Sequence, residues 1–444
     1  MSAKHKTRGT PYDGRDYPMD AMVEAWRNLA KRAVAPVYDS LDFVPQSAEG
    51  CRLYGINGSV LYDFLSCYGS LFTYDTDYVR PVIEGLLGTG RIFTSSQNIP
   101  SQEATRFADL LRRWSGYEGG VMMKSAGGMI VESAYSALFI HGSRLGIKER
   151  DKLVVIARGA FHGRARTTQT NARYDEKQYL GKGPRAAGIL VVDYTVEAVE
   201  EAFNRHGHRI CGVLLEPIQG EGGPRAGAAG ALLAARLCTR KTGALLAVDE
   251  IQSGLRRTGY KMGFEHFLAP GDRPDIVLLG KSLGWGIVAT SVMLGTTEAM
   301  SLMPRGADGE TYGGNPLACA LGMRALDVIE NENIGWRAEM LGARLADRVN
   351  EAGIRGVRAE NYGALVRIEV DGIESAAPLA KRMALDPGLP VHVFMKAGRY
   401  DAARDTAYMR VSLMPLGTTV GDVDLVCKDA LIPTLQETSD FVAR

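Results

Sequence analysis

Residues 275–286 read DIVLLGKSLGWG, a stretch that places a lysine directly after an apolar run. The run at residues 276–279 has no polar position, which predicts a strand buried on both faces of a sheet. Lys281 follows this strand after one glycine, and two more glycines stand close behind it. A lysine at such a place is either solvated at a strand end or a reactive group of a site, and the rest of the sequence decides between the two.

The surrounding segments alternate between short apolar runs and longer stretches with the period of a helix. Apolar runs lie at residues 120–123, 153–157, 188–192, 212–215, 245–248, 276–279 and 291–294. Stretches with helical period, such as residues 131–145, 196–203 and 228–237, separate them. Strands that are apolar on both faces and joined by helices predict an α/β fold with a mostly parallel sheet covered on both sides.

The two ends of the chain have a different pattern. Residues 19–34 have the period of a helix, and residues 52–64 alternate like a hairpin. Short strands near residues 364–370, 391–395 and 408–413 follow two helical segments. We therefore expect residues 1–70 to form an N-terminal arm and part of a small domain, 71–330 a large domain, and 331–444 a C-terminal small domain of α+β type.

The composition excludes several classes of partner. The 444 residues carry 52 Lys and Arg against 51 Asp and Glu, so no global field attracts nucleic acid or an anionic membrane. The six cysteines lie far apart without metal-ligand spacing, which predicts free thiols in a reducing compartment and no metal site. Because no signal peptide or membrane-spanning run is recognisable, we expect a cytoplasmic protein.

Four predicted strand ends carry the residues of a candidate site. Open α/β sheets bind ligands beyond the carboxyl ends of their strands. Residues 125–127, Ser-Ala-Gly, open a helix whose backbone N–H groups suit a phosphate, although a plain tight turn has the same sequence. Asp249 ends a buried strand and is either a helix N-cap or a carboxylate that holds a heterocyclic N–H⁺. Glu216 and Glu221 follow another strand, and Lys281 follows the fourth.

Together these groups meet the needs of pyridoxal 5′-phosphate. In a desolvated cleft the pKa of a lysine falls, and its neutral amine then forms a Schiff base with an aldehyde. The cofactor also requires a phosphate cradle and a carboxylate for its pyridinium nitrogen. Each group is ambiguous alone, and the combination predicts pyridoxal 5′-phosphate as the cofactor.

The motif around these residues resembles a known family. The segments AVDEIQSG at residues 247–254, RTG at 257–259 and PDIVLLGK at 274–281 are similar to the signature of class III pyridoxal-phosphate aminotransferases. The resemblance covers residues 38–415 and implies fold type I, the aspartate-aminotransferase-like fold, and a homodimer with shared active sites. Within the class, EPIQGE at residues 216–221 and TYGGNP at 311–316 are most similar to the ornithine δ-aminotransferases.

The resemblance implies a role for each matching residue of the cofactor site. Lys281 would bind the cofactor covalently and carry a proton between cofactor and substrate, while Asp249 would keep the pyridine nitrogen protonated. Gln252 would hydrogen-bond the phenolic oxygen of the ring, and Phe161 would stack on its face. The remaining implied contacts come from Ser125, Ala126, Gly127, Glu216 and, from the partner subunit, Thr311.

The resemblance also implies five substrate-binding residues. Tyr38, Tyr68 and Arg164 would hold the α-amino and α-carboxylate groups of a donor whose terminal amine reacts. Glu221 would mask Arg410, and the opened pair would bind the second carboxylate of 2-oxoglutarate or glutamate. A guanidinium fork suits this role because it binds a carboxylate through two parallel hydrogen bonds.

The chain departs from the family pattern close to the cofactor. Residues 125–132, SAGGMIVE, lack the glutamate of the usual Ser/Thr-Gly-x-Glu-Ala segment and contain one residue more. Trp285 places a large ring near Lys281, where it either narrows the substrate pocket or packs beneath it. The basic loop at residues 164–185 is either a solvated face or an entrance that favours carboxylate-bearing substrates.

From the resemblance we expect an aminotransferase that moves the terminal amino group of ornithine, or a similar diamino acid, to 2-oxoglutarate, giving a semialdehyde and glutamate. One alternative is another enzyme of the class, acting on lysine, acetylornithine, 4-aminobutyrate or a biosynthetic intermediate. A second is a racemase or epimerase on the same scaffold. A catalytically silent homologue is the third, and the presence of Lys281, Asp249 and Gln252 argues against it.

Overall fold

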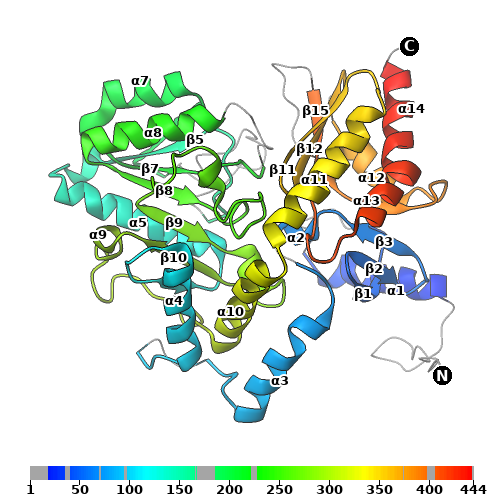
Figure 1. Cartoon of the computed structure of the whole chain (residues 1–444), viewed down its shortest axis with the longest axis horizontal. Helices are drawn as coiled ribbons and strands as arrows, with labels where there is room; N and C mark the ends of the chain where they lie inside the picture. Colours follow the sequence, from blue (N-terminus) through cyan, green and yellow to red (C-terminus); the bar gives the residue numbers. More distant parts are fainter. Residues whose placement is uncertain are drawn as a thin grey trace.

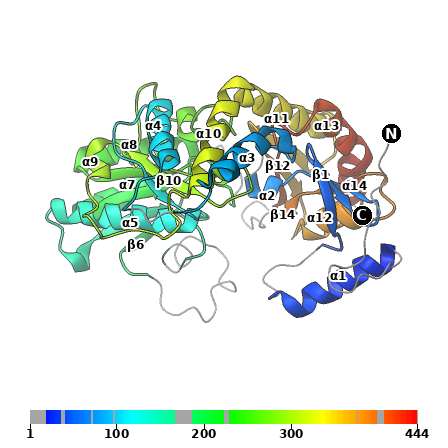
Figure 2. The ribbon, with the colours of Figure 1, turned by 90° about the horizontal axis from the view of Figure 1, so that it is seen from below.

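The structure, a computed structural model, describes residues 19–35, 41–69, 72–94, 98–165, 167, 186–221, 228–373, 375–397 and 406–442. Figure 1 shows a large α/β part beside a smaller part that is built from both ends of the chain. The short helix α2 (Ser66–Gly69) lies between the two parts in Figure 1 and in the perpendicular view of Figure 2.

The large part is organised around a seven-stranded sheet with the strand order β4-β10-β9-β8-β7-β5-β6. All neighbours are parallel except β10, which is antiparallel to both β9 and β4. The strands are β4 (Met122–Lys124), β5 (Leu153–Ala157), β6 (Ile189–Val192), β7 (Ile210–Leu215), β8 (Leu245–Asp249), β9 (Ile276–Leu279) and β10 (Ser291–Gly295). The predicted α/β fold with a mostly parallel sheet is therefore confirmed, and β4, β5, β7, β8 and β9 end at one edge.

Both faces of this sheet are buried. Alternate side chains of a strand point to opposite faces, so each strand contributes to two cores. Val155, Val213 and Val248 belong to one hydrophobic core, while their neighbours Val154, Leu214 and Ala247 belong to the other. Helix α5 (Gly127–Arg144) contributes Val131 and Leu138 to the second core. The first core is covered by α4 (Gln102–Ser115), α7 (Val196–His206), α8 (Ala228–Thr242) and α10 (Pro316–Asn331).

The smaller part contains two four-stranded sheets. One has the order β11-β12-β15-β14, with β11 (Val357–Tyr362), β12 (Leu365–Asp371), β14 (Lys396–Ala397) and β15 (Thr406–Ser412), all antiparallel. The other joins the N-terminal strands β1 (Pro45–Glu49), β2 (Arg52–Gly55) and β3 (Val60–Asp63) to β13 (His392–Phe394), which is parallel to β3. The remaining longer helices are α1 (Met19–Ala33), α3 (Arg80–Thr89), α11 (Ile334–Glu351), α12 (Ala377–Leu385), α13 (Val420–Val426) and α14 (Ile432–Val442).

The N-terminal strands thus pair with a C-terminal one, in keeping with an N-terminal segment that belongs to the small part. The domain boundaries at residues 70 and 330 stay a prediction. Within the described residues, none of the helices has the length and apolar character needed to cross a membrane.

We expect Gly342→Ala to destabilise the protein, because a Cβ at this position of α11 would lie 1.7 Å from the carbonyl oxygen of Gly363. Relieving such a backbone overlap requires α11 to move away from the β11–β12 turn, at a cost of about 3 kcal/mol in the free energy of unfolding. Urea unfolding followed by circular dichroism measures the change.

The matched control is Gly85→Ala in α3, where a Cβ meets no atom within 4 Å. Alanine is the better helix former by about 1 kcal/mol, so this variant should unfold at a slightly higher urea concentration than the unmodified protein. Equal midpoints for the two variants would contradict the close contact of α11 with the turn.

Candidate active site

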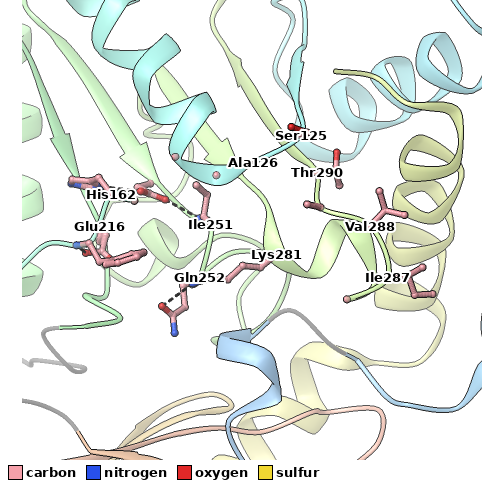
Figure 3. A pocket seen from close by; sticks show the side chains of 17 residues that line it. Ser125, Ala126, His162, Glu216, Ile251, Gln252, Lys281, Ile287, Val288 and Thr290 are labelled. Carbon is pink, nitrogen blue, oxygen red and sulfur yellow. Dashed lines mark hydrogen bonds and ion pairs between the residues drawn. The ribbon is translucent and has the colours of Figure 1, made fainter. Parts of the chain in front are cut away.

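The shared carboxyl edge of the strands opens into a cavity of about 450 Å³ (Figure 3). Its walls come from the turn between β4 and α5, the loop after β5, the ends of β7 and β8, and the segment that follows β9. The lining residues are Ser125, Ala126, Gly127, Gly128, Phe161, His162, Gly163, Glu216, Asp249, Ile251, Gln252, Lys281, Gly286, Ile287, Val288, Ala289 and Thr290. The structure therefore brings together all the residues predicted for the cofactor except Thr311.

Lys281 reaches into this cavity from a 3₁₀ turn, Lys281–Gly284, that begins one residue after β9. Its backbone has a φ of 45°, in the left-handed region, which costs a non-glycine residue about 1 kcal/mol or more. The Nζ atom donates a hydrogen bond of 3.0 Å to Oε1 of Gln252. Burial of the amine lowers the pKa of Lys281 to about 8, although the carboxylates of Asp249 and Glu216 oppose the shift.

Asp249 is held in place by His162. Nδ1 of His162 donates to Oδ2 of Asp249 at 2.8 Å, and both side chains are buried. Burial alone would lower the pKa of His162, but the hydrogen bond and the charge of Asp249 raise it above its ordinary value. The other carboxylate oxygen accepts from the backbone N–H of Ile251 at 3.1 Å. His162 was missed by the sequence reasoning, although it follows Phe161 directly.

Glu216 anchors the loop that carries Phe161. Its carboxylate accepts from the backbone N–H of Phe161 at 2.7 Å and from that of Gly220 at 3.1 Å. Burial raises the pKa of Glu216 to about 7. A Cβ at Gly220 would lie 1.9 Å from Oε1 of Gln252, so only glycine leaves room for the amide that contacts Lys281.

The opposite end of the cavity is the start of α5, as Figure 3 shows. The helix begins at Gly127 after an extended Ala126 that makes no side-chain cap. Backbone N–H groups of the first helical turn have no partner within the helix, and they attract anions. Thr290 adds a hydroxyl to this end.

Ser125 makes a contact that the sequence did not predict. Its backbone N–H donates to the carboxylate of Glu310 at 2.6 Å, and its hydroxyl donates to the same carboxylate. The buried Lys124 pairs with Asp308 in the same loop. Nothing in the residue pattern marked either acid, because the loop meets β4 only in the folded chain.

The residue pattern and the geometry of the site agree with the similarity of this chain to known proteins. The family model for class-III aminotransferases matches residues 33–396, most of the chain. The chain belongs to this family.

Relatives in the class-III aminotransferase family include mitochondrial ornithine aminotransferase from Oryza sativa, 34% identical over 74% of this chain and 68% of that protein. Acetylornithine/succinyldiaminopimelate aminotransferase from Yersinia pestis is 32% identical over 69% of this chain and 74% of that protein. A solved structure of ornithine aminotransferase from Toxoplasma gondii, with partial occupancy of pyridoxal phosphate at its active site, has a TM-score of 0.84 at 26% identity and covers 97% and 100% of the two chains.

Class-III aminotransferases depend on pyridoxal phosphate, and the residues of this site fit that cofactor. The start of α5 at Ala126 and Gly127 would hold the phosphate, and the buried Asp249 would hold the ring nitrogen. Lys281 supplies an amine and Gln252 an amide beside it. When bound, the cofactor supplies an aldehyde and an electron-accepting ring.

The predicted substrate residues are only partly brought to the site. Nη2 of Arg410 lies 3.3 Å from Oε2 of Glu221, and Nη1 of Arg410 donates to the carbonyl of Gly220 at 2.7 Å. Arg410 and Gln252 line the same small pocket. Arg164 is exposed and does not line the cavity. Tyr38 and the side chain of Tyr68 lie outside the described residues, as does most of the basic loop at 164–185. Thr311 is exposed and does not line the cavity of its own chain.

Trp285 packs beneath the site and does not narrow the cavity. Its ring is 2% exposed, lies 5.9 Å from that of Tyr78 in a stacked arrangement, and lies 4.8 Å from that of Phe72. It ends the Lys281 turn with a φ of 58°. The ring therefore supports the strained backbone on which Lys281 stands.

We expect the Lys281 amine to become reactive as pH rises through about 8, far below the 10.5 of an ordinary lysine. A lowered pKa means that the amine loses its proton at a lower pH, and only the neutral amine attacks an electrophile. Trace acetylation of the cofactor-free protein with acetic anhydride, followed by peptide mass spectrometry, gives the midpoint. Protein loaded with pyridoxal phosphate should be protected at Lys281, and a midpoint near 10.5 would show that burial does not act on this amine.

Proposed function

We propose that the protein transfers the terminal amino group of ornithine, or of a similar diamino acid, to 2-oxoglutarate, producing a semialdehyde and glutamate. The observation that carries the proposal is the Glu221–Arg410 pair beside the amine and amide of Lys281 and Gln252. A pair of this kind allows one site to take a donor with one carboxylate and an acceptor with two. The relatives named ornithine aminotransferase support the same donor.

The side chains of the site perform distinct tasks in this proposal. Lys281 takes a proton from the substrate carbon and returns it, which its pKa of about 8 permits near neutral pH. Gln252 holds the lysine nitrogen through the 3.0 Å hydrogen bond. His162 keeps the Asp249 carboxylate oriented, and the burial of both excludes water from that end of the site.

Arg410 binds the second carboxylate of 2-oxoglutarate when Glu221 moves aside, because a guanidinium freed from its partner presents a fork of donors. We place Tyr38, Tyr68 and Arg164 at the α-amino and α-carboxylate groups of the donor. Phe161 stacks on the cofactor ring in this proposal, and the anchoring of its backbone by Glu216 supports that placement.

We also propose a homodimer in which Thr311 reaches the phosphate of the partner subunit. Phe93, Ile99 and Tyr312 expose large apolar side chains, and a 2.7 Å hydrogen bond from Asn315 to Thr94 joins the two segments that carry them. Such a patch favours contact with another protein surface.

We place the enzyme in the cytoplasm, which suits the free thiols of Cys51, Cys211, Cys238, Cys319 and Cys427.

The first test uses L-ornithine without any oxo acid. Added to the cofactor-loaded protein, it should abolish the absorbance of the lysine-bound cofactor in one turnover and yield glutamate semialdehyde or its cyclised pyrroline, identified by mass spectrometry. Lys281→Ala is the control and should form no product. An unchanged spectrum with ornithine and a changed one with acetylornithine would move the donor to that of the Yersinia pestis relative. Loss of stereochemical purity without an oxo acid would instead indicate a racemase.

The second test concerns the Glu221–Arg410 pair. Glu221→Gln removes the charge that competes for Arg410, so the KM for 2-oxoglutarate should fall about tenfold, equivalent to about 1.4 kcal/mol. Arg410→Gln should raise that KM by at least as much while the half-reaction with ornithine persists. Steady-state kinetics measure both, with Glu201→Gln on the surface of α7 as a control that breaks an unrelated ion pair. A KM that Glu221→Gln leaves unchanged would show that Glu221 does not mask Arg410.

A further inference from the structure

Arg257 is one of three arginines that the described residues bury almost completely, together with Arg367 and Arg410. The other two lie against carboxylates, Arg367 against Glu369 and Arg410 against Glu221. In the part of the chain that the structure describes, the guanidinium of Arg257 contacts only uncharged oxygens. Burial lowers its pKa to about 10, which leaves it positively charged at neutral pH.

The contacts of Arg257 join the turn of Lys281 to the smaller part of the protein. Nη2 donates to Oγ of Ser282 at 3.2 Å, and Ser282 is the residue after Lys281. Nη2 also donates to the carbonyl of Gly69 at 3.0 Å, at the end of α2, and Ser282 donates to that same carbonyl at 2.9 Å. Nη1 donates to the carbonyl of Leu413 at 2.7 Å, immediately after β15, the strand that carries Arg410.

The protein leaves space for this guanidinium at a specific position. Gly69 has a φ of 92°, and a Cβ on it would lie 3.3 Å from Nε of Arg257. The backbone of Arg257 is held as well, because its carbonyl accepts from the N–H of Ala364 at 2.8 Å in the turn between β11 and β12. Arg257 is therefore held on one side by the turn after β9 in the large part. On the other side it is held by residues next to β12 and β15 in the smaller part.

We propose that Arg257 is a positioning residue for the transfer reaction: its buried guanidinium holds the Lys281 turn against α2 and the end of β15, and its positive charge, which no carboxylate of the described residues neutralises, favours the neutral amine of Lys281. The inference rests on the proposed function only in taking Lys281 as the reactive amine. It assigns a task to a residue that does not line the cavity.

The direction of the charge effect follows from the neighbours of Lys281. The carboxylates of Asp249, Glu216 and Glu221 stabilise the protonated amine, whereas burial and the charge of Arg257 destabilise it. A like charge in a region of low dielectric acts over several ångströms with little screening. Without Arg257 the surrounding carboxylates would hold a proton on Lys281 more strongly.

The test is Arg257→Gln, which removes the charge and keeps a planar amide that donates hydrogen bonds. In the full-length, cofactor-free protein, trace acetylation of Lys281 with acetic anhydride should shift its midpoint upward by about half a pH unit, which corresponds to about threefold slower labelling at pH 7. Arg256→Gln is the matched control, since the neighbouring arginine pairs with Glu330 at the surface, and it should leave the midpoint unchanged. An unshifted midpoint in folded Arg257→Gln overturns the proposal.

A second pair of variants applies if Arg257→Gln does not fold. Ser412 Oγ lies 3.4 Å from Nη1 of Arg257, so Ser412→Asp gives the guanidinium the carboxylate it lacks, while Ser412→Asn has the same shape without the charge. Labelling of Lys281 should slow in the Asp variant relative to the Asn variant, and equal labelling overturns the proposal. Because acetylation of Lys281 uses no amino donor, a wrong assignment of the donor would leave these results unaffected.

Discussion

The removal of water from the Lys281 amine is the constraint on which the rest of the site depends. A lysine at the open end of a parallel strand would ordinarily keep its proton, and burial lowers its pKa to about 8. The carboxylates of Asp249 and Glu216, which line the same cavity, favour the protonated form. The amine therefore stays usable only where desolvation outweighs its acidic neighbours, and the cavity at the carboxyl ends of the strands provides that setting.

The groups around the amine are fixed by backbone contacts more than by flexible side chains. Glu216 accepts from two backbone N–H groups, and Asp249 accepts from a third besides its histidine. Gly220 leaves room for the amide of Gln252. A site with so many fixed partners loses little free energy to reorganisation during the reaction, which is the physical basis of electrostatic catalysis.

The sequence predicted the sheet and the strand-end residues because both follow from local patterns. Lys281, Asp249 and Glu216 each lie at the end of a buried strand, so their meeting at one edge required only the rule for parallel strands. Gln252 was predicted from the resemblance to the family. His162 and Arg257 could not be assigned in this way. Their partners lie 87 and 156 residues away in the chain, and such pairings arise only from tertiary packing. Trp285 was ambiguous for the same reason. Its ring contacts Phe72 and Tyr78, which are distant in the sequence and meet it only in the folded chain.

The pairing of β3 with β13 has a consequence for folding of the chain during its synthesis on the ribosome. Strands β1 to β3 emerge early, but the strand that completes their sheet, His392–Phe394, is made near the end of synthesis. Until then β3 presents an unpaired edge, and such edges invite association with other chains. The large α/β part can complete its sheet sooner, because all seven of its strands lie between Met122 and Gly295. We infer that the N-terminal strands of the nascent chain stay unpaired until β13 has been synthesised. These strands are therefore accessible to chaperones for longer than the rest of the chain.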